Sequence, residues 1–140
     1  MSRTEAQVLE AIDRIAREVI APAAEQVDRQ GAFPRVAIDA LGQAGLLGLT
    51  VDPAVGGLGH GPRVAALVVE RIARDCGSTA MIVCMHYSAT AVLEKHAAES
   101  VRREVAAGGT CRRSPSRRSA RAACSGRLCR PRRRPLRGSG

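Results

Sequence analysis

Residues 77–93, GSTAMIVCMHYSATAVL, form the longest stretch of the 140-residue chain without a charged side chain. The stretch is too short and too polar to span a bilayer, which requires about 20 mainly apolar residues. A helix that is apolar on most sides is usually buried. We therefore predict a central, enclosed helix, capped at its start by Ser78. Its apolar positions are Met81, Ile82, Val83, Met85, Ala89, Val92 and Leu93.

An amphipathic helix is predicted over residues 8–27, where apolar side chains recur every three or four positions. Ser2 and Glu5 have the spacing of a capping box and predict its start. Pro22 cannot donate a backbone hydrogen bond and predicts a kink or a division. Gly31 predicts the end of the segment.

Three further helices complete the expected bundle. One begins at Pro34 and ends at Gly45, one runs from Pro62 to about Asp75, and a short one covers residues 99–107. Residues 45–62, rich in glycine, predict irregular backbone. We therefore expect an all-α antiparallel helical bundle over residues 1–108. The core side of the helix after Pro34 is predicted to contain Val36, Ala37, Ala40, Leu41 and Ala44.

Charge divides the chain into two unlike parts. Residues 1–108 carry 11 basic and all 13 acidic side chains, whereas residues 109–140 carry 11 arginines and no acid. The second part lacks a periodic apolar face, so we predict a disordered arginine-rich tail. With one Phe, one Tyr and no Trp, a base-stacking surface is excluded.

Targeting and redox signals favour a cytoplasmic protein. The first 13 residues contain three acidic side chains, where a secretory signal would be basic and then apolar. Five cysteines are an odd number and favour reduced thiols. The three in the tail lack the spacing of a zinc site, and we expect no metal.

Three segments, taken together, resemble the N-terminal helical domain of the acyl-CoA dehydrogenases. They are REVIAPAAEQVDRQGAFP at residues 17–34, LGQAGLLGLTVDPAVGGLG at residues 41–59, and ERIARDCGSTAMIVCMHYSATAVL at residues 70–93. Each segment alone is a weak signal, but their order and spacing agree with the family. The resemblance covers residues 4–107.

The resemblance implies a particular fold and chemistry. Such enzymes have an N-terminal helical domain, a β-domain and a C-terminal helical bundle, and FAD is held mainly by the last two. A glutamate of the C-terminal domain removes a proton α to the thioester of an acyl-CoA, and hydride passes to the flavin. Members are homo-oligomers. The chain would then be an N-terminal fragment without catalytic or FAD-binding residues of its own, inactive by itself.

Three residues of the central helix are candidates for substrate binding: Met85, His86 and Ser88. The resemblance places this helix beside the substrate cavity. The alternative, which the residues favour, is a hydrogen-bonded core role for His86 and packing or helix-surface roles for Met85 and Ser88. The glycine run at residues 56–61 is interpreted as a turn rather than a phosphate cradle, because no nucleotide-binding fingerprint surrounds it.

The tail has two alternative interpretations. Read one base out of frame from Gly108, with permitted third bases, GGTCRRSPSRRSARAACSGRLCRP becomes RHLSTLAFSEVGSRSLFWAPVSPA. This string resembles the family's entry into the β-domain, which favours a frameshifted tail, biological or due to a sequencing error. The alternative is a basic arm that binds nucleic acid or an anionic surface through its arginines.

Overall fold

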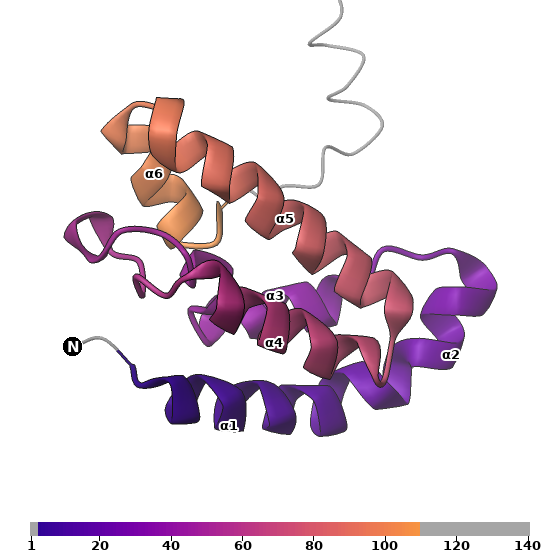
Figure 1. Ribbon diagram of the computed structural model, residues 1–140. Helices are drawn as coiled ribbons and strands as arrows, with labels where there is room; N and C mark the ends of the chain where they lie inside the picture. Colours follow the sequence, from indigo (N-terminus) through magenta and orange to yellow (C-terminus); the bar gives the residue numbers. More distant parts are fainter. Residues whose placement is uncertain (1–2, 110–140) are drawn as a thin grey trace, which may run out of the picture.

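The computed structural model describes residues 3–109, all helices and connecting turns without a β-strand (Figure 1). The all-α prediction is confirmed, while the predictions for the tail concern residues that, from position 110 onward, lie outside this range. The elements are α1 (Glu5–Ile15), the π-helix η1 (Ala16–Ile20), α2 (Ala21–Gln30), α3 (Arg35–Gln43), the 3-10 turns η2 (Leu46–Gly48) and η3 (Pro53–Val55), α4 (Pro62–Ala73), α5 (Gly77–His96) and α6 (Glu99–Ala106).

The helices form layers around α4. Figure 1 shows α4 between α1 and α5, with α6 beside the last turns of α5. Asp13 and Arg71 form an ion pair of 2.5 Å that joins α1 to α4, and Glu5 pairs with Arg63 between the same two helices. None of the helices in residues 3–109 combines the length and the apolarity needed to cross a membrane.

The first helical segment is divided before Pro22 by a π-turn. The backbone N–H of Ala21 donates to the carbonyl of Ala16, five residues earlier. A proline ring would clash with the carbonyl four residues before it, and the wider turn accommodates this ring. The predicted division is thus confirmed. Gly31 ends α2 with φ of 58°, also as predicted.

The predicted capping residues of α1 and α5 are wrong. Thr4, not Ser2, caps α1, since its hydroxyl accepts from the N–H of Gln7 and its own N–H donates to the Gln7 side chain at 2.9 Å. Cys76, not Ser78, caps α5, because its sulfur accepts from the N–H of Thr79. Each capping side chain lies immediately before the first helical residue. Ser78 instead donates to Asp28 at 2.7 Å and joins α5 to α2.

Two predicted core positions require correction. Val36 of α3 is 70% exposed, whereas Ile38, absent from the predicted core, is fully buried. The helix therefore packs through the face that carries Ala37, Ile38 and Leu41. Residues 45–61 are irregular, as predicted, yet their apolar side chains Leu46, Leu47, Leu49 and Val51 are fully buried.

Helix α5 is buried on one side only. Met81, Met85 and Val92 are 63%, 61% and 60% exposed, so the prediction of an enclosed helix is wrong for residues 3–109. The reason is that α4, η2 and α6 all pack against α5, and no described element covers the opposite side. The buried side carries Thr79, Ala80, Val83, His86, Tyr87 and Thr90.

Candidate functional site

The exposed side of α5 brings together two of the three candidate residues. We call this surface the α5 outer face; it consists of Met81, Met85, Ser88, Ala89 and Val92. The spacing of three or four residues aligns these side chains along the helix. The Ser88 hydroxyl donates to the carbonyl of Cys84 at 3.0 Å, so its hydrogen is used within the helix. The α5 outer face is therefore mainly apolar, and Met85 contributes a flexible apolar side chain to it.

His86 lies on the opposite, buried side of α5. Its Nε2 is 2.7 Å from the carbonyl oxygen of Leu47, and the neighbouring Tyr87 hydroxyl donates to the carbonyl of Leu46 at 2.8 Å. Because a carbonyl only accepts, the Nε2 atom carries the hydrogen. Two adjacent side chains therefore hold η2 against α5. This geometry supports the structural alternative for His86.

Burial lowers the pKa of His86 from its ordinary value of 6.5, and the hydrogen bond to Leu47 opposes this effect without reversing it. The unfolded chain then binds a proton more readily than the folded one. We expect the free energy of unfolding to fall as the pH drops below 6.5 and to level off below the folded pKa. Urea titrations between about pH 8 and pH 5 measure this slope.

The matched variant for this prediction is His86→Gln, which keeps an N–H donor but does not titrate. We expect its stability to vary less with pH over the same interval. Parallel pH profiles for the two proteins would show that His86 contributes nothing to the slope, since His60 and His96 are present in both.

A groove runs along one flank of α5, between α4 and α5, and has a volume of about 860 Å³. We call it the α4–α5 groove. From α4 it is lined by Pro62, Ala65, Ala66, Val69 and Glu70, and from α5 by Cys84, Tyr87, Ser88, Ala91, Glu94 and Lys95. Ser88 belongs to the α5 outer face as well. The sequence pattern did not predict this groove, although the consecutive small side chains of Ala65 and Ala66 in α4 leave space beside α5.

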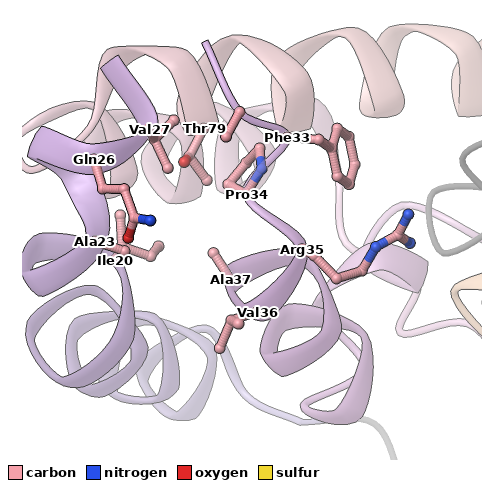
Figure 2. Close-up of a pocket in the computed structure, with 11 residues that line it drawn as sticks. Ile20, Ala23, Gln26, Val27, Phe33, Pro34, Arg35, Val36, Ala37 and Thr79 are labelled. Atoms are coloured by element: carbon pink, nitrogen blue, oxygen red, sulfur yellow. The ribbon is translucent and has the colours of Figure 1, made fainter. Parts of the chain in front are cut away.

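A smaller hollow of about 180 Å³ lies between η1, α2 and the start of α3 (Figure 2). Figure 2 shows Ile20, Ala23 and Val27 on one side and Ala37 on the other. Phe33 at its edge also lines the neighbouring hollow that reaches Met81, so the apolar surface extends from the α5 outer face toward α3.

The glycine run does not form a phosphate cradle. The N–H groups of Gly57, Leu58, Gly59 and His60 donate to the carbonyls of Asp52, Gly48, Val51 and Leu49 at 2.9–3.1 Å. Donors used in this way are not available to an anion. The arrangement supports the interpretation as a turn and does not fit the phosphates of a flavin nucleotide. Within residues 3–109, no cluster of His, Cys, Asp or Glu has the composition of a metal site.

A sequence profile of the family described as acyl-CoA dehydrogenase, N-terminal domain, matches residues 2–108. The chain belongs to the acyl-CoA dehydrogenase family. This match confirms the resemblance carried by the three segments. The N-terminal acyl-CoA dehydrogenase domain thus includes α1 to α6, and with them the α5 outer face.

Curated relatives agree with the family assignment. A probable acyl-CoA dehydrogenase of Bacillus subtilis is 35% identical over 81 residues, 58% of this chain and 21% of the relative. The human mitochondrial short-chain specific acyl-CoA dehydrogenase is 31% identical over 88 residues, 63% and 21% of the two chains. The 3-sulfinopropanoyl-CoA desulfinase of Paraburkholderia xenovorans is 34% identical over 77 residues, 55% and 20%. The matches span about a fifth of each relative's length. No solved structure matches the chain significantly.

Proposed function

We propose that residues 1–108 are the N-terminal domain of a flavin-dependent acyl-CoA dehydrogenase, and that the α5 outer face lies against the acyl group. The exposed row of Met81, Met85 and Val92 carries this proposal. Apolar side chains rarely form such a row on a monomer unless the surface is used, and methionine adapts to chains of different shape. In this arrangement Met85 contacts the acyl chain and Ser88 borders it. His86 does not touch the acyl chain; it holds η2 against the opposite side of α5.

The names of the relatives define the substrate class more firmly than the reaction. Both dehydrogenases and the desulfinase are named for CoA-linked acyl groups. An N-terminal domain shared between two reactions is suited to the part of the substrate that they have in common. We therefore assign acyl-CoA recognition to residues 1–108 and α,β-dehydrogenation to the protein as a whole.

The flavin and the catalytic base are assigned to other parts of such an enzyme. The amides of residues 56–60 are already used within the protein, and we place no flavin contact and no catalytic residue on residues 3–109. The 140-residue chain alone is then inactive. Purified chain should contain no stoichiometric flavin and should not reduce a dye acceptor with an acyl-CoA. Bound flavin together with turnover would contradict this assignment.

A chimera tests the acyl-binding role directly. Residues 3–108 replace the matching segment of the Bacillus subtilis relative, and Met85→Glu is introduced into the chimera. A carboxylate pressed against an alkyl chain should lower kcat/KM at least tenfold, roughly the desolvation cost of a buried polar group. Val36→Glu, an exposed valine on α3, is the matched control. Equal losses in the two variants would argue against a specific role for Met85.

The arginine-rich tail is assigned to a change of reading frame. Its composition, with 11 arginines and no acid, and its out-of-frame similarity to the family support this assignment. Sequencing the coding DNA from the codon of Val101 to beyond the present stop tests it. A missed or added base near Gly108, or a family-like continuation in the shifted frame, is the expected result.

The same charge favours a second candidate function, a nucleic-acid-binding arm. Binding through arginine and phosphate weakens steeply with salt. Strongly salt-dependent RNA binding that disappears on deletion of residues 109–140, together with an unbroken frame, would favour this candidate over the frameshift.

A further inference from the structure

We infer that residues 50–57 and 98–108 open and close together as one unit over the end of α5, while the rest of the bundle stays folded. The first segment contains η3 and the second contains α6, and we call the two together the flap. Figure 1 shows α6 at the end of α5 that lies away from α2. A region opens on its own when few buried apolar side chains hold it to the main core.

The flap has a small hydrophobic cluster of its own. Val51 and Val55 of the first segment and Val105 of the second are buried in it, and Leu93 of α5 and Ala106 pack against them. The main cluster, which contains side chains from α1 to α5, includes none of these residues. Because the two segments share one cluster, moving either segment away uncovers apolar side chains of the other. Their openings are therefore coupled.

The polar contacts of Glu94 tie the flap only weakly to α5. The Glu94 carboxylate accepts from the N–H of Asp52 at 3.4 Å and lies 3.9 Å from a nitrogen of Arg102. The first distance is longer than that of an ordinary N–H···O hydrogen bond, and the second is too long for any hydrogen bond. One carboxylate thus touches both segments of the flap and holds neither firmly.

The closed flap buries two polar atoms that have no hydrogen-bond partner. They are the Oγ1 atom of Thr50 and the Nε atom of Arg102, one in each segment. Within residues 3–109 no other buried side-chain nitrogen or oxygen atom lacks a partner. An atom of this kind recovers a hydrogen bond when water reaches it. Opening of the flap therefore hydrates both atoms, which lowers the free energy of the open state relative to the closed one.

The backbone next to each segment provides hinges. Leu58 donates to the carbonyl of Gly48 at 3.0 Å, and His60 donates to that of Leu49 at 2.9 Å, so both ends of the first segment are held. Residues 97–98, between α5 and α6, are extended, with ψ of 153° at both positions. Residues at the ends of elements absorb the rotation in hinge motions. The second segment can thus turn about the end of α5.

The position of the flap affects the α4–α5 groove. Thr50 of the flap lines one end of this groove together with Glu94 and Lys95 of α5. An open flap uncovers that end, and a closed flap covers it. The inference requires no ligand and does not rest on the proposed function.

Hydrogen exchange of the full chain, followed by mass spectrometry under native conditions, tests the inference. We expect the amides of both flap segments to share one opening constant, at least tenfold larger than that of α1 and α4. Ile38→Ala weakens the main cluster, to which Ile38 belongs. It should speed exchange in α1 and α4 and leave the flap unchanged; Ile38→Val replaces it if the alanine variant does not fold. Equal acceleration everywhere would mean that the flap opens only by global unfolding, which overturns the inference.

Two flap variants test the coupling and its cause. Val105→Ala removes two buried methyl groups and should speed exchange of residues 50–57 and 98–108 by the same factor, roughly tenfold. Thr50→Val removes the unpartnered hydroxyl at nearly constant shape and should slow both segments at least fivefold, roughly the cost of one unsatisfied buried group. Acceleration confined to residues 98–108 in the first variant, or no slowing in the second, would contradict the inference.

Arg103→Gln is the matched control within α6. Arg103 is exposed and pairs with Glu99 of the same helix at 2.5 Å. Loss of such an exposed pair should change the exchange of residues 50–57 less than about twofold. A change as large as that of Val105→Ala would mean that the shared apolar cluster does not couple the segments, and the inference would fail.

Discussion

Truncating Ile38 to alanine is expected to lower the free energy of unfolding by about 2–5 kcal/mol, the range for large aliphatic side chains in a core. Ile38 has no exposed surface and belongs to the main hydrophobic cluster, where α3 packs against α1 and η1. The truncation removes buried methyl and methylene groups and leaves a cavity that the surrounding helices fill only in part. Equilibrium unfolding in urea measures the difference.

Val36→Ala is the matched control, two residues earlier in the same helix. Val36 is 70% exposed, so its truncation should change the free energy of unfolding by less than about 0.5 kcal/mol. Alanine also has the higher helix propensity, which offsets part of any loss. The reverse order of the two effects would mean that α3 packs through a face rotated from the one described.

This pair of residues shows why the sequence predicted α3 but not its packing face. Val36, Ala37 and Ile38 are consecutive apolar residues, so two overlapping faces satisfy the helical period. The predicted face contained Val36, Ala37, Ala40, Leu41 and Ala44, whereas the structure buries Ala37, Ile38 and Leu41. Which of the two faces is buried depends on where α1 packs. The periodicity of a single helix carries no information about the position of its neighbours.

The same limitation applies to the candidate site. Similarity to the family identified Met85, His86 and Ser88 as candidates. Successive helical residues differ by about 100° around the axis, so these positions do not all face one way. Only the packed structure places His86 against Leu47 and leaves Met85 exposed. The α4–α5 groove requires two helices and the loop carrying Thr50, and no single segment predicts it.

The glycines of the loop between α3 and α4 predicted irregular backbone. They did not predict that the apolar side chains of this loop contribute to the core. Leu46, Leu47, Leu49 and Val51 are fully buried, because the loop folds back on itself and is held by backbone hydrogen bonds. The N–H of Gly59 donates to the carbonyl of Val51 at 2.9 Å. Any residue can make such a backbone hydrogen bond, but Gly57, two residues earlier, lies so close to Val51 that no side chain fits there.

Gly57→Ala is therefore expected to be strongly destabilising. A Cβ atom at this position would lie 2.1 Å from the Val51 carbonyl oxygen and 2.5 Å from the Val51 Cβ. Val51 is fully buried, and its carbonyl would have to give up the bond to Gly59 to move away. We expect a loss of about 3 kcal/mol, the upper part of the range for overpacked positions, measured by urea unfolding.

Two other glycines separate this steric effect from backbone strain. Gly61, the N-cap of α4, has φ of −77° and open space where a Cβ atom would lie, so Gly61→Ala should cost less than about 1 kcal/mol. Gly45 also has open space but φ of 73°, so Gly45→Ala should cost about 1–2 kcal/mol through strain alone. The expected order is Gly57, then Gly45, then Gly61. If Gly57→Ala unfolds at the same urea concentration as Gly61→Ala, the loop does not approach Val51, and the position of Thr50 at the groove loses its support.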